Sequence, residues 1–227
     1  MKITYYGQGC FAIETKGKTI VTDPFISGNP LAKHIDIDRI SADYIVLSHG
    51  HQDHTLDAIP LAKRTGAKII APYEIHVWAQ GQGIENTHPM NPGGKWNFDF
   101  GTLLCVTAVH SSSFPDGSYA GNPVGFVLWN EEGCVYFAGD TALTMDMKLI
   151  PMLCPALDIA LLPIGDNFTM DVKGAILASD FIACPKVIGC HYDTFGFIKI
   201  DHAESQNAFE AAGKELILLD IGSHLEV

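Results

Sequence analysis

Positive charge is scarce in this sequence of 227 residues, which has 14 lysines and arginines against 26 aspartates and glutamates. The formal net charge of −12 at pH 7 makes the average surface repel polyanions. Nucleic acids and anionic membrane surfaces are therefore excluded as electrostatically attracted partners. Charged residues make up only 18% of the chain and hydrophobic residues 47%, a balance typical of a folded globular protein.

Long apolar runs and paired cysteines are also missing. No segment approaches the roughly 18 consecutive apolar residues of a membrane span. The first nine residues lack the apolar stretch of a secretory signal. The six cysteines are scattered without a C-x-x-C pair, and most lie inside apolar runs. Such cysteines are typical of buried free thiols in a reducing compartment, so we expect a cytoplasmic protein.

Short β-rich runs separated by glycine-containing turns dominate the first part of the chain. Tyr44–Ser48 is apolar without clean alternation, which indicates a strand buried on both faces. Further strands are predicted at Lys2–Tyr6, Cys10–Thr15, Thr19–Phe25, Ala67–Ala71, Lys95–Phe100, Thr102–His110, Val124–Trp129, Cys134–Ala138, Asp158–Leu162, Lys186–Cys190 and Leu216–Leu219. Helices are predicted at Asp53–Arg64, Pro72–Gln80, Thr144–Leu153, Val172–Ala183 and His202–Gly213.

Strand-rich runs with interspersed helices occur in both halves of the chain, and no linker separates the halves. This order predicts an α/β protein of the α+β type: an αββα sandwich of two mixed β-sheets packed together, with helices outside. A chain of 227 residues can bury a substantial core as one unit. We therefore expect a single domain over residues 1–227.

The densest group of potential metal ligands is H-G-H-Q-D-H at residues 49–54, directly after a predicted strand. Side chains at positions i and i+2 of an extended chain point the same way, so His49 and His51 can hold one metal together. The turn into the following helix can redirect Asp53 and His54 toward a second metal. A lone His-x-His is common in surface loops, whereas this hexapeptide is a more specific pattern.

Three further polar residues follow buried apolar strands, where a side chain can be mounted rigidly: His110, Asp140 and His191. Imidazole and carboxylate ligands together suit zinc, and also iron or manganese, without thiolates. Gly50 has no Cβ, which lets the loop between the first two histidines wrap closely around ions. The sequence thus predicts a metal centre built from the ends of several strands.

This pattern resembles the metallo-β-lactamase superfamily, whose H-x-H-x-D-H motif, later histidine, bridging aspartate and final histidine match in order over nearly the whole chain. The resemblance implies two divalent ions, zinc first with manganese or iron as alternatives, each with three ligands and with one shared bridge. The implied ligands are His49, His51 and His110 for the first metal, Asp53, His54 and His191 for the second, and Asp140 between them.

Three segments resemble a narrower bacterial and archaeal family of metal-dependent hydrolases, which is similar to the L-ascorbate-6-phosphate lactonase group. The segments are I-T-Y-Y-G-Q-G-C-F at 3–11, A-G-D-T at 138–141 and P-I-G-D-N-F-T-M at 163–170. This narrower resemblance names no substrate, and it makes a homo-oligomer an expectation.

Departures from the patterns of other superfamily members exclude several relatives. Common zinc β-lactamases carry cysteine where Asp140 stands, and flavodiiron oxidoreductases carry glutamate where His51 stands. The chain is also too short for the large inserted domain of the RNA-processing nucleases. The resemblance therefore favours hydrolysis of a small molecule that is neither a β-lactam antibiotic nor RNA.

The predicted activity is hydrolysis of a small ester, lactone or phosphodiester. Two metals roughly 3.5–4 Å apart can share a hydroxide and lower the pKa of its parent water toward about 7. Asp140 would bridge the metals, and Asp53 would orient the nucleophile and later carry a proton. No G-x-S-x-G elbow suggests a serine nucleophile instead. Thr141 and Asn167 are the candidate substrate contacts.

Two other classes of protein fit the same ligands. A non-catalytic metal-binding or sensing module would keep the fold without turnover, although the intact ligand set favours an enzyme. A redox di-iron protein would show visible absorption and contain about two irons per chain. Hydrolysis that stops on chelation and returns with metal separates the enzyme from both.

Overall fold

One of the two β-sheets is a mixed sheet that contains the first six strands of the chain and also the last strand. In the computed structural model, which describes residues 1–227, its strand order is β14-β1-β2-β3-β4-β5-β6. Pairing is antiparallel from β14 to β3 and parallel from β3 to β6. The strands are β1 (Lys2–Gly7), β2 (Cys10–Thr15), β3 (Lys18–Thr22), β4 (Tyr44–Val46), β5 (Lys68–Pro72), β6 (Thr87–Met90) and β14 (His224–Glu226).

The second sheet repeats this design with the order β13-β12-β11-β10-β9-β8-β7. Pairing is antiparallel from β7 to β10 and parallel from β10 to β13. The strands are β7 (Lys95–Phe98), β8 (Gly101–Thr107), β9 (Val124–Asn130), β10 (Gly133–Phe137), β11 (Ile159–Pro163), β12 (Lys186–Cys190) and β13 (Glu215–Ile217).

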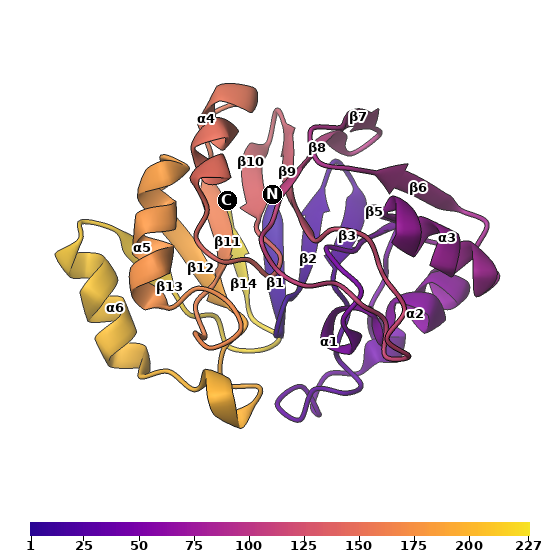
Figure 1. Cartoon of the computed structure of the whole chain (residues 1–227), viewed down its shortest axis with the longest axis horizontal. Helices are drawn as coiled ribbons and strands as arrows, with labels where there is room; N and C mark the ends of the chain where they lie inside the picture. Colours follow the sequence, from indigo (N-terminus) through magenta and orange to yellow (C-terminus); the bar gives the residue numbers. More distant parts are fainter.

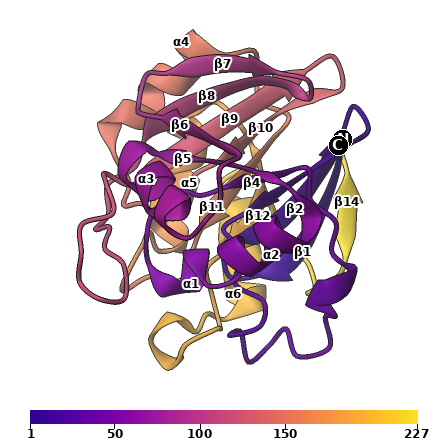
Figure 2. The same ribbon diagram turned by 90° about the vertical axis from the view of Figure 1, so that its right-hand side faces the viewer.

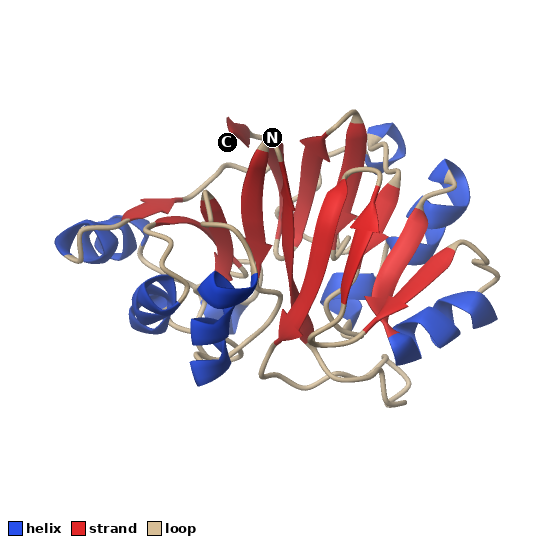
Figure 3. Ribbon diagram, turned by 90° about the horizontal axis from the view of Figure 1, so that it is seen from above, coloured by secondary structure: helices blue, strands red, loops and turns tan.

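Helices cover the outer faces of both sheets, as Figure 1 shows from the front and Figure 3 from above. The first sheet is covered by α2 (Ala58–Thr65) and α3 (Tyr73–Gly81), which lie in front in Figure 2. The second sheet is covered by α4 (Ile150–Leu153), α5 (Val172–Phe181) and α6 (His202–Ala211). The remaining short helices are η1 (Ile37–Arg39), α1 (Gln52–Thr55), η2 (Met145–Leu149) and η3 (Gly196–Ile198).

Alternating side chains of the same strands fill three apolar layers. In β11, Ile159 and Leu161 belong to the core between the sheets, whereas Ala160 and Leu162 pack under α5 and α6. Strands buried on both faces read as continuous apolar runs, because both sets of alternating positions face other elements. The predicted αββα sandwich is confirmed.

Two predicted helices are each divided in the structure. Residues 53–64 form α1 and α2, because the Asp57 N–H donates to the Pro24 carbonyl instead of continuing a helical ladder. Residues 144–153 form η2 and then α4, whose first turn contains Pro151, a residue without an N–H to donate. The strands β6 and β14 were not predicted.

Candidate metal centre

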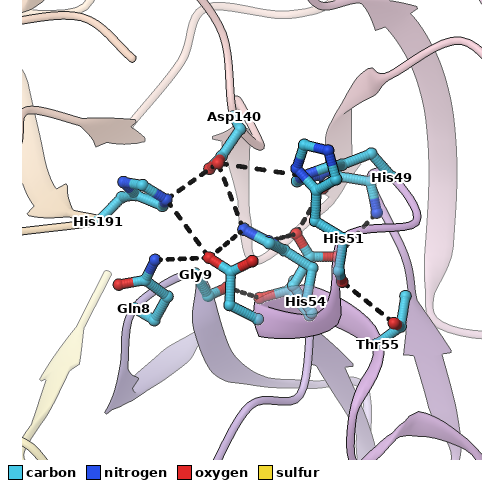
Figure 4. A network of polar contacts seen from close by, with 12 residues as sticks. Gln8, Gly9, His49, His51, His54, Thr55, Asp140 and His191 are labelled. Carbon is cyan, nitrogen blue, oxygen red and sulfur yellow. Dashed lines mark hydrogen bonds and ion pairs between the residues drawn. The ribbon is translucent and has the colours of Figure 1, made fainter. Parts of the chain in front are cut away.

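The loop after β4 places the first two histidines together. His49 is fully buried, and its Nε2 lies 2.9 Å from Nδ1 of His51. The following helix α1 carries Asp53 and His54, and it turns His54 toward the same region (Figure 4). Oδ2 of Asp53 lies 3.4 Å from Nε2 of His54. His54 is also fully buried, with its ring centroid 4.1 Å from that of His49.

His110 reaches this cluster from a loop rather than from a strand end. β8 ends at Thr107, three residues before it. The His110 ring centroid lies 5.1 Å from that of His49 and 5.1 Å from that of His51. The Thr141 hydroxyl accepts a hydrogen bond from the Val109 N–H at 3.0 Å, which fixes the loop just before His110.

Asp140 and His191 arrive from the second sheet, after β10 and β12. The Oδ2 atom of Asp140 faces four imidazole nitrogens. These are Nε2 of His191 at 2.9 Å, of His54 at 3.3 Å, of His110 at 3.6 Å and of His49 at 4.0 Å. One buried carboxylate oxygen therefore stands between side chains of both sheets (Figure 4).

Three sets of side chains have ligand atoms that all lie within 4.8 Å of one another. Two of the sets are those implied by the sequence resemblance. The sets are His49, His51 and His110; Asp53, His54 and His191; and Asp23, His49 and His54. The structure thus brings all the predicted ligands to one place and adds one aspartate.

Asp23 lies behind His54 rather than beside the ligand atoms that face Asp140. Its Oδ2 is 2.8 Å from Nδ1 of His54, whereas Nε2 of His54 points toward Asp140 and Asp53. Asp23 also accepts hydrogen bonds from the backbone N–H and the hydroxyl of Ser48. These bonds occupy its carboxylate, so Asp23 orients His54.

Gln8 and Gly9, in the tight turn between β1 and β2, support the second ligand set. The Gln8 side chain donates from Nε2 to Oδ2 of Asp53 at 2.9 Å, and the backbone carbonyl of Gln8 accepts the His191 N–H at 3.0 Å. A Cβ on Gly9 would lie 3.2 Å from the His54 ring, so a side chain here would press on this ligand. Sequence reasoning missed Gln8 and Asp23, although Asp23 interrupts an apolar run as the predicted ligands do.

The sequence-based interpretation of Gly50 needs revision. The open side of Gly50 faces Ala120, whose Cβ would be 2.2 Å from an added Cβ, so this glycine makes room for a loop rather than for ions. Asp57, directly before α2, accepts hydrogen bonds from the backbone N–H groups of Ile26 and Ser27 and from the Ser27 hydroxyl, and so holds that loop against the start of the helix.

The charges of the cluster are strongly perturbed by burial and by one another. Burial lowers the pKa of His49 well below its usual value, and neighbouring imidazoles lower it further. Burial also opposes charge on His54 and His191, but nearby carboxylates outweigh it, and Asp140 has the largest effect among them. These carboxylates raise the pKa of His54 well above its usual value and the pKa of His191 to about 9. Because metal-bound imidazoles are neutral, a metal ion would compete with protons for His54 and His191.

The residues present fit divalent metal ions. Nε2 of His54 is buried without a hydrogen-bond partner, which is the state expected of a nitrogen that donates a lone pair to a metal. Five imidazoles and two carboxylates supply only nitrogen and oxygen donors, the set preferred by zinc, manganese and iron. The six cysteines are free, and none belongs to a ligand set.

A cavity of about 710 Å³ opens onto the cluster. It is lined by His51, Asp53, His110, Ser111, Asp140, Phe168, His191, Thr194, Phe195, Gly196 and Phe197. Thr141 and Asn167 are absent from this lining. Thr141 is fully buried, and its hydroxyl donates to the Ala142 carbonyl, while Asn167 lies on a left-handed turn with φ of 53°. Their contact with a substrate stays a prediction.

Comparison with known proteins identifies the family. A family model described as the beta-lactamase superfamily domain matches residues 2–191. A UPF0173 metal-dependent hydrolase of Christiangramia forsetii is 57% identical over 228 residues, which cover both chains completely. The chain therefore belongs to the beta-lactamase superfamily and, within it, to the UPF0173 metal-dependent hydrolases. The protein is thus a metal-dependent hydrolase, which confirms the resemblance seen in the sequence.

Solved structures agree with this assignment. Igni18, a metallo hydrolase from the archaeon Ignicoccus hospitalis, is 34% identical with a TM-score of 0.88, and the match covers 99% of this chain and 97% of that one. An isothiocyanate hydrolase from Delia radicum gut bacteria shares the fold at 18% identity and a TM-score of 0.80, over 100% of this chain and 99% of that one. The structure has no helix of the length and apolarity that crossing a membrane requires.

Proposed function

We propose that this enzyme is a dinuclear hydrolase that cleaves a small ester, lactone or phosphodiester. The observation that carries the proposal is the position of the Asp140 Oδ2 atom. It lies 3.6 Å from Nε2 of His110 and 2.9 Å from Nε2 of His191, which belong to different ligand sets. A carboxylate oxygen that faces both sets is suited to bridge two ions.

The proposed cofactors are two zinc ions, with manganese or iron as alternatives. His49, His51 and His110 would hold one ion, Asp53, His54 and His191 the other, and Asp140 would contact both. In this assignment Asp23 and Gln8 are not metal ligands, and each forms a hydrogen bond with a ligand, Asp23 with His54 and Gln8 with Asp53. The six free cysteines support a reducing, cytoplasmic location.

The chain's own residues have distinct roles in the proposed reaction. When bound, two such ions supply Lewis acidity and a water whose pKa is lowered toward about 7. The Asp53 side chain is 23% exposed and lines the cavity, whereas that of Asp140 is 4% exposed. We assign Asp53 to hold the attacking water and accept its proton, and Asp140 to join the two halves of the centre. Gln8 holds Asp53 in place.

Reversible dependence of hydrolysis on metal tests the proposal. Protein stripped with a chelator should cleave neither p-nitrophenyl butyrate nor bis(p-nitrophenyl) phosphate, and two equivalents of zinc, manganese or iron should restore cleavage of at least one. A protein that takes up two ions again and cleaves no ester, lactone or phosphodiester would be a non-catalytic metal-binding module. Turnover that requires a coloured iron form and an electron donor would indicate redox chemistry.

A further inference from the structure

Three phenylalanines make up the apolar part of the cavity lining, beside the polar side chains of the metal centre. Phe168, Phe195 and Phe197 are 49%, 36% and 78% exposed. Phe168 follows β11, Phe195 directly precedes η3 after β12, and Phe197 lies within η3. Large exposed aromatic groups that line a reaction cavity offer apolar contact to a ligand.

The two loops that carry these rings are held by backbone hydrogen bonds. The Asp166 N–H donates to the Met170 carbonyl at 3.0 Å, and the Asp193 N–H donates to the Ile198 carbonyl at 2.8 Å. The Phe168 and Phe197 rings approach edge to face, with centroids 6.4 Å apart. Phe168 and Phe197 therefore pack together across two loops, and Phe195 lines the same cavity. The three side chains are here called the phenylalanine wall (Phe168, Phe195 and Phe197).

No lysine or arginine lines this cavity. The basic residues closest in sequence to the phenylalanine wall are Lys173 and Lys199. Both line a separate cavity of about 260 Å³. Four carboxylates line that second cavity with them: Asp166, Asp171, Asp201 and Glu204. A phosphorylated or otherwise anionic substrate body would thus find no cation in the reaction cavity apart from the metal centre, in a chain of net charge −12.

We infer that the substrate is an uncharged ester or lactone whose apolar acyl part packs against the phenylalanine wall; the inference rests on the proposed function. In the reaction, the oxygen of water bonds to the acyl carbon and the bond from that carbon to the ester oxygen breaks. One proton of the water ends on the leaving oxygen, which gives a carboxylic acid and an alcohol, or a hydroxy acid from a lactone. The wall selects for the acyl chain and takes no part in the bond changes.

A series of p-nitrophenyl esters tests the inference with the metal-loaded enzyme. From acetate through butyrate to hexanoate, kcat/KM should rise by up to about fourfold per methylene, since each buried methylene adds transfer free energy. The mono-p-nitrophenyl ester of adipic acid has the same chain length as the hexanoate and ends in a carboxylate, so it should be a much poorer substrate. A flat series, or a preference for the adipate or for bis(p-nitrophenyl) phosphate, would overturn the inference.

Substitutions in the wall show where the chain-length preference comes from. Phe168→Ala and Phe197→Ala should raise KM for the hexanoate about fivefold or more, and the loss of kcat/KM should grow with the length of the acyl chain. Both variants should retain their metal content. Trp96→Ala is the matched control, because Trp96 is an exposed aromatic residue (54%) on β7 outside the cavity. Equal effects of all three variants would overturn the inference, as would a change of oligomeric state in the phenylalanine variants without a change in KM.

A binding measurement separates failure of this inference from failure of the proposed function. In ligand-observed NMR, hexanamide should bind to the wild-type protein and lose binding in Phe197→Ala, whether or not esters are cleaved. Binding of hexanamide without any hydrolysis would contradict the proposed function and leave the wall supported. Hydrolysis without any preference for apolar chains would contradict the wall alone.

Discussion

At the scale of single residues, the orientation of the metal-facing side chains depends on polar partners behind them. Asp23 is fully buried and lies 2.8 Å from Nδ1 of His54. An imidazole whose Nδ1–H donates to a carboxylate presents the lone pair of Nε2 on its other side. The Nε2 of His54 faces Asp140 at 3.3 Å, as this arrangement requires.

Replacing Asp23 should weaken the metal centre and the fold together. In Asp23→Ala, His54 Nδ1 and the Ser48 N–H lose their partner, and removal of one member of a buried pair costs about 3–5 kcal/mol of stability. Metal affinity should fall about 10- to 100-fold, as for other residues that orient metal ligands. Urea unfolding and competition with a chelating dye measure the two effects.

Asp57→Ala is the matched control for this substitution. Asp57 is also buried and also accepts backbone N–H groups, those of Ile26 and Ser27, but it contacts no predicted ligand. The control should lose stability and keep its metal affinity. Equal losses of metal affinity in the two variants would mean that Asp23 acts only through the stability of the fold.

At the scale of elements, the sequence predicts which side chains gather at the site, because most of them are tied to regular structure. Parallel strands end at a common edge of their sheet, so polar residues just after β4 lie at that edge of the first sheet and those just after β12 at that edge of the second. Asp23 was missed because it lies inside the predicted strand Thr19–Phe25, whereas β3 ends at Thr22. The strand β6 was missed because it contains Pro89, which is unusual in strands.

The loop between β4 and α1 has a stricter packing requirement than its sequence suggests. In Gly50→Ala, the new Cβ would lie 2.2 Å from the Ala120 Cβ, and one of the two loops must move. We expect a loss of about 1–3 kcal/mol of stability, typical of overpacking, and reduced metal affinity because His49 and His51 flank this residue. Gly81→Ala is the control, since its Cβ meets no atom within 4 Å at the end of α3; if it lost as much metal affinity, the packing explanation would be wrong.

At the scale of the whole molecule, the site lies between two sheets that share a core. That core contains Phe11 of the first sheet, whose ring centroid lies 6.4 Å from that of Phe137 of the second. Both sheets contribute ligands, His49 from one and Asp140 and His191 from the other. We propose that residues 1–227 form one domain, because separating the sheets would expose the core and divide the centre.

Unfolding in urea should accordingly be a single cooperative transition. Trp78 packs on the helix-covered face of the first sheet and Trp129 on that of the second. Two variants, one with Trp78 and one with Trp129 as its single tryptophan, should show the same urea midpoint by fluorescence, since both halves unfold together. Two separate midpoints would show that the sheets belong to independent units.

The central claim is a pair of metal ions joined by Asp140. Elemental analysis of protein purified without chelators or added metal tests it most directly, by comparing wild type with Asp140→Ala and with the exposed control Asp146→Ala. The account predicts about two zinc, manganese or iron ions per chain in the wild type and the control, and clearly fewer in Asp140→Ala. A wild-type protein that binds no metal even after supplementation, or an Asp140→Ala variant that retains both ions, would contradict it.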